Sequence, residues 1–100
     1  MLVARLGTRF VGAVRGVVDG SVCHVGRLVV APDLQGRGIG RRLLLAIEQH
    51  APASRFTLFT GHRSVGNLGL YRSVGYEVVR EDQVTDTLTL VHLDKLAPTR

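Results

Sequence analysis

The stretch "VVAPDLQGRGIGRRLLLAI", residues 29–47, decides the fold because it passes from a strand through a glycine loop into a helix. Pro32 stops its first apolar residues, which indicates the end of a strand. Three alternating glycines follow, Gly36, Gly38 and Gly40. Beyond them, apolar residues recur at helical spacing until Pro52, so the sequence predicts a helix over about residues 40–51.

The glycine loop is predicted to be a cradle for an anion. Without Cβ atoms its backbone N–H groups can approach an anion closely, and the helix N-terminus adds unpaired N–H groups and partial positive charge. Arg41 and Arg42 stand in the first turn, where a cation opposes the helix dipole by up to about 1 kcal/mol and a docked anion would offset the repulsion. The alternative is a flexible turn before an exposed basic helix face. The G-x-G-x-G spacing matches neither a P-loop nor a Rossmann loop.

The residues before this stretch predict three antiparallel strands. Two apolar runs within residues 2–17 are separated by Gly7 and Thr8, which indicates a hairpin. An Asp-Gly turn at residues 19–20 leads into a long third strand that ends before the glycine loop. Gly26 lies inside that strand and marks a candidate β-bulge.

A strand and a short second helix are predicted after the first helix. "RFTLFT", residues 55–60, alternates as a strand. Ser64 then stands where an N-cap hydroxyl is expected, and Gly75 occupies the left-handed position after the last helical turn. The sequence therefore predicts a helix between these two residues.

Two closing strands complete the chain. "YEVVRE" (76–81) and "TLTLVHL" (87–93) alternate as strands joined by the polar residues 82–86, and residues 97–100 are expected to be a frayed tail. The predicted order is β-β-β-α-β-α-β-β. This order gives an α+β (mixed α/β) fold with a mostly antiparallel sheet and two helices.

The composition indicates one globular domain over residues 1–100. A chain of 100 residues with 45% hydrophobic and 21% charged residues can bury a modest core. Its single cysteine, Cys23, cannot form an intramolecular disulfide, and its place between Val22 and His24 favours a buried small hydrophobe over a nucleophile. Neither a leader nor a long apolar segment is seen, so we expect a cytoplasmic protein with no membrane partner.

The charge balance leaves an anionic partner open. A formal net charge of +5 is compatible with nucleic acid, a phospholipid surface or a phosphorylated small molecule. Nucleic acid is the weaker choice and is not predicted as a partner, because the basic residues are scattered and the aromatic residues do not interleave with them. The histidines lack metal-ligand spacing, so no metal is predicted.

The segment "GRLVVAPDLQGRGIGRRLL", residues 26–44, closely resembles the motif Q/R-x-x-G-x-G/A of the GNAT family of N-acetyltransferases. In that family the motif binds the pyrophosphate of acetyl-coenzyme A (acetyl-CoA), and Gln35, Gly38 and Gly40 match it position by position. A second segment, "NLGLYRSVGY" (67–76), looks like the family's later helix with its tyrosine. The resemblance covers about residues 1–94 and implies a GNAT-like fold.

The resemblance implies a set of residues that bind acetyl-CoA. The backbone of Leu28, Val29 and Val30 matches the strand that pairs with the pantetheine arm and polarises the acetyl carbonyl. Asn67 is expected to contact coenzyme A, although Ser64 replaces an asparagine that many members carry. The pyrophosphate is expected on the loop residues Gln35, Gly36, Arg37, Gly38, Ile39, Gly40 and Arg41.

The resemblance also implies two residues that handle protons. Tyr71 aligns with the usual general acid, which protonates the departing thiolate; the alternative is a core tyrosine with its hydroxyl at the surface. His24 lies eleven residues before Gln35, where some members place a glutamate base, and imidazole titrates near neutrality. The alternative is a histidine packed on the sheet. His50, His62 and His92 have no such placement.

The chain departs from the family at its beginning. Most members start with a strand and one or two helices before the antiparallel strands, whereas this sequence starts at about the second strand. Without those elements an apolar sheet face is expected to be uncovered, which favours association or instability. The resemblance to the family, whose members often form homodimers, implies a homodimer.

Three functions follow from these patterns. The first is an acetyl-CoA-dependent N-acetyltransferase, in which a primary amine of a small molecule or peptide attacks the thioester directly in a ternary complex. The second is a catalytically weak acyl-CoA-binding module or partner subunit. The third is a basic nucleic-acid-binding domain. The first is favoured because the cradle and the tyrosine helix occur together.

Overall fold

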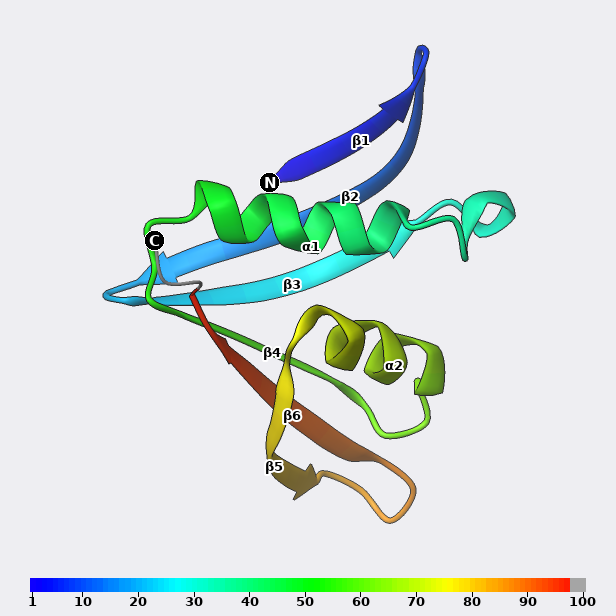
Figure 1. The fold of residues 1–100 in the computed structure, drawn as a ribbon. Helices are drawn as coiled ribbons and strands as arrows, with labels where there is room; N and C mark the ends of the chain where they lie inside the picture. Colours follow the sequence, from blue (N-terminus) through cyan, green and yellow to red (C-terminus); the bar gives the residue numbers. More distant parts are fainter. Residues whose placement is uncertain (98–100) are drawn as a thin grey trace.

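A computed structural model describes residues 1–97 and forms one six-stranded sheet with two helices (Figure 1). The order of elements is the predicted one, with one added 3-10 turn. The elements are β1 (Leu2–Leu6), β2 (Arg9–Asp19), β3 (Val22–Val30), η1 (Pro32–Leu34), α1 (Ile39–His50), β4 (Arg55–Gly61), α2 (Val65–Val74), β5 (Glu77–Gln83) and β6 (Thr89–Leu96).

The sheet is antiparallel except at one junction. The strand order is β1-β2-β3-β4-β6-β5, and only β3 and β4 run parallel. These two strands pair from Val22 with Arg55 to His24 with Thr57, and no pairing between them is found farther along residues 1–97. The edge of β3 that faces β4 is therefore unpaired over residues 26–30.

The turns and the bulge follow from local sequence. Gly7 and Gly20 have φ of 64° and 63° in the two hairpins, as the glycine signals predicted. The β2–β3 register shifts between Ala13 and Arg15, and Arg27 has φ of 52°. The bulge therefore falls just after Gly26, and it bends β3 immediately before residues 28–30.

Both helices pack on the same face of the sheet, where the core lies. Leu43, Leu44 and Ile47 of α1 are buried with alternate strand residues, and Tyr71 and Val74 of α2 join the same cluster. Glycine on β2 permits the close approach of α1, because a Cβ at Gly16 would lie 2.9 Å from Ile47 Cγ1. Cys23 is fully buried, as predicted, and burial raises the pKa of its thiol.

Two local predictions in the second half of the chain are wrong. The last strand begins at Thr89 and ends at Leu96, later than the predicted 87–93, because it pairs with β4 as far as the Arg55–Leu96 pair. Ser64 does precede α2, but its hydroxyl makes no capping hydrogen bond. Gly75 has the predicted left-handed conformation, with φ of 110°. Of the predicted tail, residues 98–100 lie outside the described residues.

The other face of the sheet carries no helix within residues 1–97. Large apolar side chains point away from the helices there, and we call this surface the open face. Neither α1 nor α2 is long and apolar enough to cross a membrane in this part of the chain. The exposed apolar side chains of the open face are Val3, Phe10, Val17, Val29 and Phe59.

Candidate active site

A cavity of about 540 Å³ lies where the end of β3 meets the N-terminal ends of α1 and α2. It gathers the predicted coenzyme residues from the end of β3, from the glycine loop with the start of α1, and from α2, which follows more than 20 residues later. Arg37 alone among them is absent from its lining and instead borders a separate cavity of about 420 Å³ between α1 and the β1–β2 hairpin. The predicted residues that line the first cavity are Leu28, Val29, Val30, Gln35, Gly36, Gly38, Ile39, Gly40, Arg41 and Asn67.

The three glycines of the loop are needed for different structural reasons. Gly36 and Gly38 have φ of 80° and 83°, which strains any other residue, and the space where their Cβ atoms would lie is open. Gly40 is helical, and its Cβ would lie 3.1 Å from Leu70 Cδ2. The first two therefore shape the cradle, whereas Gly40 lets α1 and α2 pack closely.

The backbone N–H groups of residues 35–41 make no hydrogen bond to any of the described residues. The first helical bond of α1 is donated by Arg42 N to Gly38 O at 3.0 Å, and no side chain caps this helix. Unpaired donors at the positive end of a helix bind anions, and Arg41 adds a guanidinium to the cavity. This donor set fits a diphosphate such as that of coenzyme A.

Two contacts hold the loop before the cradle. Gln35 Nε2 donates to the carbonyl of Val30 at 3.3 Å. Arg9 of β2 makes a two-pronged ion pair with Asp33 of η1, at 2.9 and 2.7 Å, which holds the pKa of the Asp33 carboxyl below its usual range. Sequence reasoning missed this pair, since nothing local links residues 9 and 33.

Tyr71 lies on α2, one turn after Asn67, and is 7% exposed. Burial raises the pKa of its phenol. Its hydroxyl makes no hydrogen bond within residues 1–97, yet no fully buried side-chain oxygen or nitrogen in this part lacks a partner. The hydroxyl therefore reaches accessible space and is free to bond a ligand. Tyr71 does not line the 540 Å³ cavity.

His24 lies on the open face. Its neighbours Cys23 and Val25 are buried on the helix side, so His24 and Tyr71 lie on opposite sides of the sheet. His24 is exposed and makes no hydrogen bond to the described residues. The two predicted proton-handling residues are thus not brought into contact.

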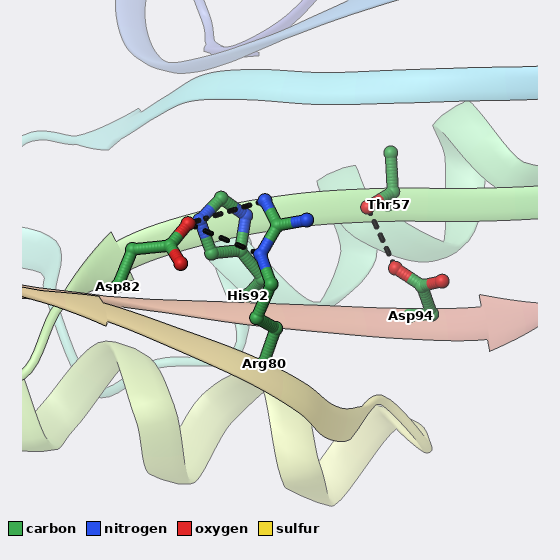
Figure 2. A network of polar contacts seen from close by, with 5 residues as sticks. All are labelled: Thr57, Arg80, Asp82, His92 and Asp94. Atoms are coloured by element: carbon green, nitrogen blue, oxygen red, sulfur yellow. Dashed lines mark hydrogen bonds and ion pairs between the residues drawn. The ribbon is translucent and has the colours of Figure 1, made fainter.

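A polar network on the open face was missed by the sequence analysis, which gave His92 no role (Figure 2). His92 Nε2 lies 3.0 Å from Asp82 Oδ2, and Arg80 Nε donates to the same oxygen at 3.1 Å. On the same face, Thr57 Oγ1 donates to Asp94 Oδ1 at 2.6 Å. The alternating pattern of β6 was the only sequence signal for this network. The register shift in β5 hid which of its residues lie opposite the residues of β6.

Comparison with known proteins identifies the family. The family model described as acetyltransferase (GNAT) domain matches residues 1–97. The chain belongs to the GNAT acetyltransferase family. The resemblance predicted from the cradle motif is therefore confirmed, and so is the predicted fold. No curated protein matches the chain.

Solved structures share the GNAT fold over nearly the whole described chain. The IAA acetyltransferase from Bacillus cereus is 24% identical with a TM-score of 0.82, over 94% of this chain and 75% of that one. A GNAT family acetyltransferase from Elizabethkingia anophelis with acetyl-CoA bound is 19% identical with a TM-score of 0.84, over 94% and 73%. An aminoglycoside 6'-N-acetyltransferase complexed with coenzyme A is 15% identical with a TM-score of 0.86, over 98% and 72%.

Proposed function

We propose that this GNAT domain, one domain over residues 1–100, transfers the acetyl group of acetyl-CoA to a primary amine of a small molecule or peptide, by direct attack in a ternary complex. The observation that carries the proposal is the run of unpaired N–H groups at residues 35–41. Two of the similar structures contain acetyl-CoA or coenzyme A, which supports the same donor here.

The chain's own residues divide the binding task. The N–H groups of the cradle and the Arg41 guanidinium would hold the diphosphate. The unpaired edge of β3 offers backbone donors and acceptors at Leu28–Val30 to an amide-containing arm and to the acyl oxygen. Acetyl-CoA supplies an activated thioester carbonyl when it is bound. Positioning both substrates converts the attack into an effectively intramolecular step.

Tyr71 is proposed as the general acid. The phenol is protonated at neutral pH, since burial raises its pKa further above the ordinary value of about 10, so a proton is available for a departing thiolate. His24 is proposed as the general base that accepts the ammonium proton, because its exposed imidazole has no competing hydrogen bond within the described residues. We expect Tyr71→Phe and His24→Ala each to lower turnover by about 10²–10⁴-fold.

A second candidate is an acyl-CoA-binding module with weak catalysis. It is favoured by the separation of Tyr71 and His24 on opposite sides of the sheet. The open face also supports association of two copies, because large apolar side chains such as Phe10 and Val29 are exposed on it. Sedimentation velocity of the chain and of Phe10→Lys tests this homodimer, which should dissociate in the variant.

Calorimetric titration with acetyl-CoA tests the proposed function first. We expect a Kd in the micromolar range that is lost in Gly38→Glu, which places a carboxylate in the cradle. Gly38→Ala is the matched control, because it imposes the same backbone strain at φ of 83° without the charge, and it should retain most of the affinity. A panel of primary amines, followed by release of the free thiol, then tests transfer. Binding without turnover on any amine would favour the binding module.

A further inference from the structure

A buried charged cluster lies at the opposite end of α1 from the cradle. Lys95 Nζ of β6 donates to Glu48 Oε1 of α1 at 2.6 Å, and the Tyr76 hydroxyl donates to Glu48 Oε2 at 3.2 Å. The side chains of Lys95 and Glu48 are 15% and 3% exposed. The proposed reaction uses none of these three residues directly.

Burial of this ion pair is not explained by stability alone. Removing two charges from water costs several kcal/mol per ion, so a buried pair is often no more stable than apolar residues of the same size. Here both oxygens of Glu48 have donors, and Lys95 Nζ donates a second hydrogen bond to the carbonyl of Val74 at 2.8 Å. A fully satisfied cluster of this kind fixes geometry between the elements that it joins.

The cluster fixes the last turn of α2, which carries Tyr71. Val74 is the last residue of that helix. The N–H of Tyr76 donates to the carbonyl of Tyr71 at 3.0 Å, and the two tyrosine rings lie 6.1 Å apart at 59°. Tyr71 is thus joined to Tyr76 through the backbone and through ring packing, and Tyr76 is anchored on Glu48.

We propose that Glu48, Tyr76 and Lys95 act as a clamp that positions the Tyr71 phenol for the reaction. The clamp rests on the proposed role of Tyr71 as the general acid. Because α1 carries the cradle at its first turn and Glu48 in its last, the helix links the two sites rigidly. Loss of the clamp should therefore lower turnover, while acetyl-CoA binding at the other end of α1 persists.

Tyrosine titration offers a direct readout, because the chain has two tyrosines and no tryptophan. Subtracting the titration of the matching Tyr71→Phe variant isolates the near-ultraviolet absorbance of ionised Tyr71. We make this comparison for the wild type and for Glu48→Gln, which keeps the shape of residue 48 but removes its charge and leaves Tyr76 in place. Release of the clamp should admit water and lower the pKa of Tyr71 towards its ordinary value of about 10.

Kinetics complete the test on the amine that gives turnover. We expect Tyr76→Phe and Glu48→Gln to lower kcat by about tenfold or more, with the acetyl-CoA Kd changed less than about threefold. Arg55→Met is the control, since it breaks an exposed ion pair to Asp94 on the open face, and it should leave kcat and the Tyr71 titration unchanged. Circular dichroism verifies that each variant is folded.

The outcomes separate the clamp from the proposed function. An unchanged kcat in the folded Tyr76→Phe and Glu48→Gln variants, or an identical Tyr71 titration with and without Glu48→Gln, would overturn the clamp. Wild-type protein that binds acetyl-CoA but acetylates no amine would overturn the proposed function instead. In that case the Tyr71 titration still decides whether the cluster holds the phenol.

Discussion

The two ends of α1 are built in opposite ways. At the first turn, the N–H groups of residues 35–41 are left without partners around Gly36 and Gly38. At the last turn, Glu48 is buried and both of its oxygens accept hydrogen bonds. The difference teaches that one helix can offer an unsatisfied end to a ligand because its other end is held by satisfied contacts.

The largest expected effect breaks the satisfied end. Lys95→Met leaves the Glu48 carboxylate buried beside one neutral donor, and loss of one partner of a buried pair costs about 3–5 kcal/mol of unfolding free energy. Chemical denaturation measures this loss. The double variant Glu48→Met/Lys95→Met should recover most of the stability, because it leaves no unpaired charge. A Lys95→Met protein as stable as the wild type would show that the ion pair is not engaged.

A smaller effect is expected at the unsatisfied end. Gly38→Ala forces a side chain into the left-handed region and should lower the free energy of unfolding by about 1–2 kcal/mol. Gly66→Ala is the control, since Gly66 lies in α2 with open space around its Cβ position and should gain up to about 1 kcal/mol from helix propensity. Equal effects at the two glycines would contradict the strained cradle.

The alkaline limb of stability tests the burial of Tyr71. Its pKa is raised in the folded state, so the folded protein binds more protons than the unfolded chain above the unfolded value of about 10. The contribution of Tyr71 to stability should therefore be fully present below about pH 10 and be lost as the pH rises through the folded pKa. Thermal unfolding measured across this pH range should show that Tyr71→Phe loses stability less steeply than the wild type. The remaining slope belongs to Tyr76 and Cys23, whose pKa values are also raised.

The smallest effect is expected from the exposed pair that holds η1. Arg9→Met removes both hydrogen bonds to Asp33 and should weaken acetyl-CoA binding about fivefold or less, because exposed ion pairs contribute little. Arg80→Met breaks an exposed pair on the open face and is expected to leave the Kd unchanged. Calorimetry at two salt concentrations measures both variants, and the Arg9 effect should shrink as salt rises.

The sequence predicted the cradle because its parts are contiguous. Three glycines and the start of the first helical turn lie within residues 35–41, so one short motif carries both the backbone conformation and the donor set. The motif did not reveal that Arg37 turns away to another cavity. It also gave one reason for three glycines, although Gly40 serves helix packing rather than anion access.

The clamp and the open-face network could not be predicted in this way. Glu48 is 28 residues from Tyr76 and 47 from Lys95, so only the packed fold brings them together. The pairing of His92 with Asp82 depends on the register of β5, where the shift between Val78 and Arg80 changes which side chains oppose β6. Long-range contacts and bulges thus determine these two arrangements, and local sequence patterns do not reveal them.

The most direct measurement of the central claim is an amide-resolved NMR titration of the chain with acetyl-CoA, and in parallel with inorganic pyrophosphate. If the unpaired N–H groups of the cradle bind the diphosphate, the amide resonances of residues 35–41 should show the largest shifts with both ligands. The predicted result is that acetyl-CoA shifts the resonances of this segment and that pyrophosphate reproduces part of these shifts. Shifts confined to the open face, with residues 35–41 unchanged, would contradict the account.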